Sequence, residues 1–239
     1  RPAFRHAVTT GTILSDKGEK LSKSRQNFPD PWLLFEKYGV DALRFYLMSS
    51  SVMTADNINF SERDVDEVYK KYSLISYNVL NLFKLYRGSP RRQNIKSAAS
   101  SHVLDRWILS RLHLTIKEVT QNFDKYETVS AVRPLLSFVQ DLSLWYVRRS
   151  RERIKSDTPD SKKAIATLEK VLLDFSRLIA PVTPFLAEII YRELPSKRKV
   201  SVHLEDWPGF QKKYIDGKLE KDMATVRSIA SQALRLRAE

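Results

Sequence analysis

The stretch that sets the fold class of this chain is "LLSFVQDLSLWYVRRSRERIK", residues 135–155. On an α-helix, where successive residues turn by about 100°, its apolar side chains gather on one side. Leu135, Val139, Leu142 and Tyr146 form this apolar stripe. A helix with one apolar side must bury it against other elements, so the stretch predicts a protein built from packed helices.

Helical spacing of apolar residues recurs along most of the remaining chain. Asp30 and Thr183 each precede a proline, the usual order of an N-cap and a first helical residue. Asp41 is a third predicted N-cap, and Ser61 with Asp64 is a predicted capping pair. The predicted helices are 31–38, 42–49, 65–86, 104–119, 129–155, 165–179, 184–194 and 219–239.

Pro134 conflicts with an uninterrupted helix over 129–155, so the sequence predicts either a start or a bend at this residue. Residues 1–29 are predicted to form short strands and turns, and 87–101 is a polar linker. The predicted fold class is mainly α, a helical bundle preceded by a small α+β part. We expect the chain to be divided into four consecutive domains or segments, residues 1–29, 30–60, 61–210 and 211–239.

The composition of the chain limits the functions that it can have. The chain has 41 Lys and Arg against 28 Asp and Glu, a formal charge of +13, which attracts polyanions. There is no cysteine, which excludes disulfides and thiolate metal sites, and four scattered histidines predict no metal centre. No apolar run reaches the roughly 18 residues that a membrane span needs, and no secretory signal is seen. We therefore expect a cytoplasmic protein.

The arginines after the apolar stripe fall into two sets. Arg148, Arg151 and Lys155 lie together on the far side of the helix, where they predict a cationic ridge for a phosphate backbone; a simply solvated face is the alternative. Arg149 and Arg153 lie beside the stripe and are expected to pair with carboxylates. The nearest candidate partners along the chain are Asp141 and Glu152.

Two tryptophans need separate interpretations. Trp145 lies beside the ridge and is a candidate for stacking on an unpaired RNA base. Because aromatic residues at helical spacing are usually core, packing between helices is the alternative. Trp107 is assigned to the core for the same reason, and His113 is treated as structural or surface.

A compact cationic loop, Lys20-Leu21-Ser22-Lys23-Ser24, lies near the start of the chain. Two ammonium groups three residues apart, with hydroxyls beside them, can surround a phosphate chain and stabilise a departing pyrophosphate. A solvated surface turn is the alternative for these five residues.

This loop resembles the Lys-Met-Ser-Lys-Ser motif of class I aminoacyl-tRNA synthetases, with Leu21 in place of Met. The stretch "DPWLLFEKYGVDALRFYL" resembles the segment that follows the loop in the same synthetases. Three further stretches resemble isoleucyl-tRNA synthetases: "DLSLWYVRRSRER", "LIAPVTPFLAEIIYREL" and "SVHLEDWP". The stretch "LDRWILSRL" does so too, and "WYVRRSRER" favours the isoleucine enzymes over their valine, leucine and methionine relatives. The resemblance runs in order along the chain, apart from 87–101.

The resemblance implies a bundle of the class Ia anticodon-binding type and a piece of a longer, monomeric enzyme. That enzyme would activate isoleucine with ATP and Mg²⁺ and transfer it to tRNA(Ile). Lys23 would contact the ATP phosphates, Lys20 would assist, and Ser22 and Ser24 would orient the loop. The resemblance places Arg148, Arg151, Lys155 and Trp145 in the tRNA-binding bundle.

The chain has no two nearby histidines for a His-Ile-Gly-His type motif, so we expect no adenylation by this chain alone and no tightly bound cofactor. A stand-alone RNA-binding module without catalysis is the rival function, although such a module has no need of the lysine loop. A membrane-surface protein would need an exposed apolar helix face, whereas the stripes here match what helix packing consumes. We expect no membrane partner.

Overall fold

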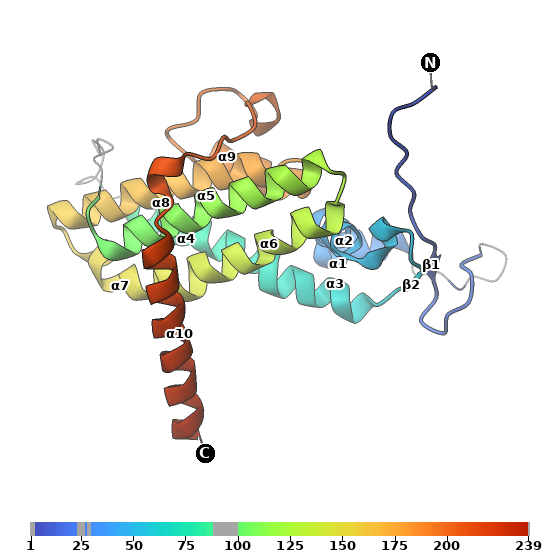
Figure 1. Ribbon diagram of the computed structural model, residues 1–239, viewed down its shortest axis with the longest axis horizontal. Helices are drawn as coiled ribbons and strands as arrows, with labels where there is room; N and C mark the ends of the chain where they lie inside the picture. The colour runs from blue at the N-terminus through green and yellow to red at the C-terminus, as the bar shows by residue number, and fades with distance from the viewer. Residues whose placement is uncertain (1–2, 23–26, 28–29, 88–99, 239) are drawn as a thin grey trace.

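The computed structural model describes residues 3–22, 27, 30–87 and 100–238 (Figure 1). It is mainly helical, with a two-stranded sheet, which confirms the predicted fold class. The strands are β1 (Ile13–Leu14) and β2 (Ile58–Asn59). The helices are α1 (Pro31–Tyr38), α2 (Val40–Ser49), α3 (Glu62–Val68), α4 (Leu74–Arg87), α5 (Val103–Asp124), α6 (Thr128–Gln140), α7 (Arg148–Lys155), α8 (Pro159–Ile179), α9 (Pro184–Arg192) and α10 (Gly217–Ala238).

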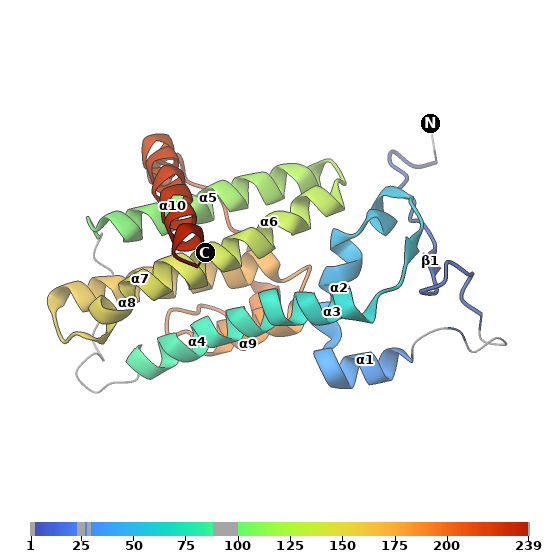
Figure 2. The same ribbon diagram turned by 90° about the horizontal axis from the view of Figure 1, so that it is seen from below.

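The long helices α4, α5, α6 and α8 lie side by side along the long axis of the molecule, as both views show (Figures 1 and 2). The strands lie at one end of this bundle and α7 at the other, while α10 crosses the bundle and projects away from it. Within the described part of the chain, no helix is both long and apolar enough to cross a membrane.

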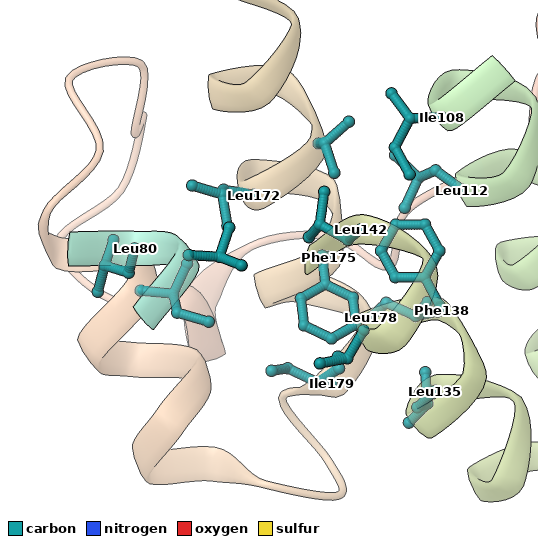
Figure 3. Close-up of a cluster of buried hydrophobic side chains, with 14 of the residues drawn as sticks. Leu80, Ile108, Leu112, Leu135, Phe138, Leu142, Leu172, Phe175, Leu178 and Ile179 are labelled. Atoms are coloured by element: carbon teal, nitrogen blue, oxygen red, sulfur yellow. The ribbon is translucent and has the colours of Figure 1, made fainter. Parts of the chain in front are cut away.

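The core of the bundle is one large cluster of side chains, mostly from α4 to α9, which also includes Phe45 of α2 and Met223 of α10 (Figure 3). All four members of the predicted stripe, Leu135, Val139, Leu142 and Tyr146, are at most 1% exposed. Trp107 is also buried, as predicted. The helical period of the sequence therefore locates the core correctly.

Two of the predicted helices contain π-helical stretches. Tyr69–Ser73 joins α3 to α4, and Asp141–Val147 joins α6 to α7. The predicted helices 65–86 and 129–155 are therefore each continuous, but with wider turns in the middle. Such stretches are rare and frequently lie near functional sites.

Pro134 lies inside α6, and the helix starts six residues before it, at Thr128. Because proline has no backbone N–H, the carbonyl of Ser130 loses its usual helical donor. The side-chain amide of Asn122, on the neighbouring helix α5, donates to this carbonyl at 3.0 Å. A partner from another helix thus lets the proline sit within α6.

The small sheet joins the N-terminal segment to the chain that follows α2. β1 and β2 pair in parallel, with Ile13 opposite Ile58. Just before β1, the backbone N–H of Gly11 donates to the carbonyl of Val52 at 2.7 Å. A Cβ atom on Gly11 would lie 1.9 Å from the carbonyl oxygen of Asp56, so only glycine permits this close approach.

The predicted cap of α2 is wrong. Gly39, at φ 79°, both ends α1 and precedes α2, so Asp41 lies in the first turn of α2. The Asp41 carboxylate instead accepts from the backbone N–H of Leu186 at 2.6 Å, in the first turn of α9. Burial raises the pKa of Asp41, while backbone donors of α9 act in the opposite direction.

Thr183 precedes α9 as predicted, but its side chain does not cap that helix. Its hydroxyl lies 3.1 Å from the hydroxyl of Tyr72, which is fully buried in the bundle. The capping role passes to Asp41, 145 residues away from Leu186 in sequence. By contrast, Ser61 caps α3 by accepting from the N–H of Asp64, as predicted.

Two arginines tie the segment around α2 to the bundle. Arg44 donates to the carbonyls of Val182 at 3.0 Å and Pro181 at 2.9 Å, in the turn between α8 and α9. Arg133, on α6, donates to the carbonyl of Ser49 at 3.0 Å. Together with Asp41, these bonds satisfy backbone groups at helix ends and hold α2 against the bundle.

A buried carboxylate sets the position of α7. Asp105, on α5, has no exposed surface, and it accepts from the hydroxyl of Tyr146 at 2.7 Å. Both terminal nitrogens of the Arg153 guanidinium donate to its two oxygens, one of them at 3.1 Å. The predicted pairing of Arg153 with Asp141 or Glu152 is therefore wrong, because its partner comes from another helix.

We expect Arg153→Met to lower the free energy of unfolding by about 3–5 kcal/mol, because Asp105 then stays buried without its counter-charge. Arg151→Met, on the exposed side of the same helix, is the matched control and should change stability by less than about 0.5 kcal/mol. Urea denaturation measures both. The double variant Asp105→Asn with Arg153→Met should recover part of the loss, and equal costs for the two single variants would contradict the assignment.

Candidate nucleic-acid interface

Helix α7 presents cationic side chains to solvent on one side and is buried against the bundle on the other. Arg148, Arg151 and Lys155 are exposed, whereas Ser150 and Ile154 are buried. The three cations, which we call the α7 ridge, therefore lie where the sequence predicts them. Lys155 also pairs with Glu152 at 3.0 Å, on the same helix.

The first arginine beside the stripe has no carboxylate partner among the described residues. The Arg149 guanidinium lies 4.8 Å from the ring centroid of Trp145, over its face. The predicted pairing of Arg149 with Asp141 or Glu152 is therefore wrong. A cation held over an indole ring is stabilised by the electron density of that ring, and Arg149 stays exposed beside the α7 ridge.

Trp145 is half-buried and packs against α10. Its indole N–H donates to the sulfur of Met223 at 3.1 Å, and Arg227 of α10 lies 5.8 Å from its ring. These neighbours already occupy part of the ring's surroundings. Stacking of Trp145 on an RNA base stays a prediction. The packing alternative accounts for every contact that the structure shows.

Asp141, in the π-helical stretch after α6, forms ion pairs with both α5 and α10. It accepts from Arg111 of α5 at 3.0 Å and pairs with Arg227 of α10 at 2.5 Å. Arg111 also lies 3.7 Å from Glu220, in the first turn of α10. This cluster of ion pairs anchors the first half of α10 to the bundle.

The start of the lysine loop is held by one asparagine. The side chain of Asn27 accepts from the backbone N–H of Ser22 at 2.8 Å and donates to the carbonyl of Lys20 at 3.1 Å. Lys20 also pairs with Leu14 as an isolated bridge beside β1. Lys23 and Ser24 lie outside the described residues, so their predicted roles stay predictions.

The described part of the loop contains one lysine without a carboxylate partner among the described residues. Lys20 is exposed, and no carboxylate of the described residues lies within ion-pair distance of its ammonium group. A locked ion pair at Lys20 would have argued against a phosphate-binding role. Across the same residues, no group of three or more His, Asp and Glu side chains is placed to hold a metal ion.

His113 is a residue that the sequence interpretation left undecided between a structural and a surface role. It is fully buried on α5, and its ring stacks on Tyr214 with centroids 4.7 Å apart and planes inclined by 6°. Burial lowers the pKa of His113 to about 4, and the ammonium groups of Lys170 and Lys213 act in the same direction. Its position directly after Leu112, beside the apolar residues Ile108 and Ile116 of the same helix, is the sequence signal for burial.

Two family models match this chain, one over the helical bundle and one over the N-terminal part. A family model described as the anticodon-binding domain of tRNA ligase matches residues 105–239, more than half of the chain. The chain belongs to this family. A second model, of class I tRNA synthetases for isoleucine, leucine, methionine and valine, matches residues 1–60, which contain the lysine loop.

Similar curated proteins are isoleucine–tRNA ligases. The chain is 41% identical over its whole length to the Chlamydia pneumoniae enzyme and covers 23% of that protein. It is 38% identical to the Chlamydia abortus enzyme, of which it covers 24%. The chain thus spans about a quarter of the length of the curated relatives that it matches.

Two solved structures share the fold. One is the LeuRS of Agrobacterium radiobacter K84 in a complex with tRNA and LeuAMS, with a TM-score of 0.65 and 22% identity over 87% of this chain and 24% of that one. The other is the methionyl-tRNA synthetase of Mycobacterium tuberculosis, with a TM-score of 0.62 and 21% identity over 83% of this chain and 41% of that one. At these identities the likeness concerns the fold alone.

We expect His113 to make stability depend on pH between about 4 and its ordinary pKa of about 6.5. In that range the unfolded chain binds a proton that the folded chain excludes, so acidification destabilises the fold. His113→Gln should lose less stability than the parent between pH 7 and pH 4.5, measured by urea denaturation. His203→Gln, at an exposed position, is the control and should follow the parent. Identical pH profiles for parent and His113→Gln would contradict this account.

Proposed function

We propose that this chain is the tRNA-binding part of an isoleucine–tRNA ligase, together with the loop that contacts ATP in such an enzyme. The observation that carries the proposal is the match to isoleucine–tRNA ligases along the entire chain, at 41% identity for the first of them. The membership of residues 105–239 in the anticodon-binding family supports tRNA as the partner. The proposed tRNA is tRNA(Ile), and the proposed state is a monomer.

In this proposal, the α7 ridge contacts the phosphate backbone of the tRNA. Arg148, Arg151 and Lys155 follow one another at about one-turn steps on the exposed side of α7. Each phosphate that they neutralise releases condensed counterions, which favours binding at low salt. The +13 charge of the chain attracts the tRNA from a distance. Arg149 is exposed beside the ridge, and an unpaired base would reach the ring of Trp145 only if Arg149 moved off its face.

The lysine loop would act in the complete enzyme, where isoleucine reacts with ATP. There the isoleucine carboxylate attacks the α-phosphate and pyrophosphate leaves. Lys23, with Lys20 assisting, would neutralise charge that develops on the leaving pyrophosphate, and Ser22 and Ser24 would donate hydrogen bonds. Mg²⁺ would supply further positive charge on the phosphates when it is bound with ATP. The two hydrogen bonds from the Asn27 side chain to the backbone of Lys20 and Ser22 would keep the start of the loop in place.

The rival function, a stand-alone RNA-binding module, is less favoured. It explains the bundle and its charge but gives no reason for residues 1–60, which match the class I synthetase model. The exposed Lys20 is likewise unexplained in a module that only binds RNA. The ligase activity and its substrates, isoleucine, ATP and tRNA(Ile), are proposed for the complete enzyme.

We expect the chain to bind tRNA(Ile) with an affinity that falls steeply as salt rises. In Arg148→Ala with Arg151→Ala, the slope of log affinity against log salt should shrink by about one unit for each phosphate that the variant no longer neutralises. Filter binding at several salt concentrations measures this slope. The control variant, Arg63→Ala with Arg192→Ala, removes the same charge from α3 and α9 and should keep most of the slope. Equal slopes for the two double variants would remove the ridge from the RNA surface.

We also expect no isoleucine-dependent exchange of pyrophosphate into ATP by this chain alone, because it contains no pair of nearby histidines of the type that class I enzymes use. Exchange by the purified chain above a background without isoleucine would contradict this expectation. In the complete enzyme, Lys23→Ala should lower the exchange rate far more than Lys17→Ala, which removes a lysine from the turn before the loop.

A further inference from the structure

A pocket of about 380 Å³ lies between α5, α8 and the segment 213–217 that leads into α10. Its volume is within the range of roughly 300–1,000 Å³ that is usual for small-ligand sites. It shares no residue with the α7 ridge or the lysine loop. Its walls combine polar and apolar side chains, which include Arg106, Leu109, Thr167, Lys170, Lys213 and Tyr214.

Several polar groups of the pocket have no partner among the described residues. Lys213 makes no ion pair there. Within the same part of the chain, Thr167, only 6% exposed, forms no hydrogen bond through its hydroxyl, and neither does the hydroxyl of Tyr214. A nearly buried hydroxyl in a helix normally donates to a carbonyl one turn back, as Thr115 does. The pocket therefore offers hydrogen-bond donors that the protein itself leaves unused.

The charge of the pocket favours an anion. Arg106 is balanced by Asp216 at 2.6 Å, and Lys170 by Asp174 at 3.0 Å. Lys213 has no such balance from the described carboxylates, so one positive charge remains.

The apolar part of the pocket favours a ring. Tyr214 is fixed from behind by its stack on buried His113. The ammonium groups of Lys170 and Lys213 lie 5.4 and 5.1 Å from the Tyr214 ring centroid. Leu109, Ala166 and Ile215 line the pocket as well. Cationic groups around an aromatic residue, beside an apolar wall, suit a ligand that joins an oxyanion to a flat ring.

We propose that this pocket binds a nucleoside phosphate. The phosphate lies against Lys213 with Lys170 and Arg106 nearby, and the base lies against Leu109 and Tyr214. The hydroxyls of Thr167 and Ser100 are within the pocket wall and serve the sugar or the phosphate. Such a unit can come from a nucleotide of bound RNA or from a free mononucleotide, and both present the same chemistry.

The first test uses 5′-AMP as the probe. Calorimetry measures its affinity, and amide chemical shifts of the isotope-labelled chain show where it binds. We expect 5′-AMP to bind at least about tenfold more tightly than either adenosine or inorganic phosphate, with shifts concentrated on 166–170 and 213–217. Equal affinity for inorganic phosphate would overturn the nucleoside part of the proposal. Failure of 5′-AMP to bind at millimolar concentration would overturn all of it.

Variants test the pocket residues directly. Lys213→Met should weaken 5′-AMP binding about tenfold or more, since a charge-assisted hydrogen bond is removed. Lys212→Met, at the adjacent exposed lysine outside the pocket, removes the same charge and should leave binding within about twofold. Thr167→Val keeps the shape of the side chain and should also weaken binding. Equal losses for Lys212→Met and Lys213→Met would contradict a specific site.

Competition with tRNA(Ile) distinguishes the two sources of the ligand. Displacement of 5′-AMP by tRNA assigns the pocket to a nucleotide of bound RNA, and simultaneous binding assigns it to a free nucleotide. The proposal is independent of the α7 ridge, since Arg148→Ala with Arg151→Ala should weaken tRNA binding and leave 5′-AMP binding unchanged. Absence of tRNA binding with intact 5′-AMP binding would refute the proposed function alone.

Discussion

The orientation of α7 depends on one buried ion pair. Asp105 lies in the core of the bundle, where an unpaired carboxylate would be very costly, and Arg153 supplies its counter-charge. Because Arg153 must face α5, the helix has little freedom to rotate about its axis. Arg148 and Arg151 are then directed to solvent. A deeply buried charge of the bundle thus determines which charges its surface presents.

A second set of contacts makes the segment around α2 continuous with the bundle. Asp41 binds the N-terminus of α9, and Arg44 binds the carbonyls between α8 and α9. Each bond pairs a charged side chain with backbone groups that a helix end leaves unsatisfied. The segment that follows the lysine loop and the helices that carry the cationic surface therefore belong to one packed body. In the proposed enzyme, the ATP loop and the tRNA surface would be held at a fixed separation by these bonds.

The sequence predicts the local features of this structure well. Helical period alone locates the core of α6 and α7, and the Ser61 cap follows from adjacent residues. Most of the errors concern pairs that are far apart in the chain, such as Asp41 with Leu186, because spacing along one helix carries no information about another helix. The predicted partner of Arg153 is wrong for the same reason. The exception is Arg149, whose partner Trp145 lies one turn away on the same helix. In the site, the exposure of the α7 ridge was predictable, whereas the pocket beside Tyr214 needs three separate segments to meet.

The π-helical stretch Asp141–Val147 has a consequence for how this surface can change in evolution. Along and after it, the buried positions Leu142, Tyr146, Ser150 and Ile154 succeed one another every four residues. In a regular α-helix such a row drifts around the axis by about 40° per step, and the wider turns reduce this drift. A π-helical turn holds about one residue more than an α-helical turn, so the loss of one residue from the stretch would let it become regular α-helix with the arginines after it facing much as before. One added residue, by contrast, would turn everything after it by about 100°. Single deletions within the stretch should therefore be tolerated better than single insertions, which would turn Arg153 away from Asp105 and change which arginines face solvent.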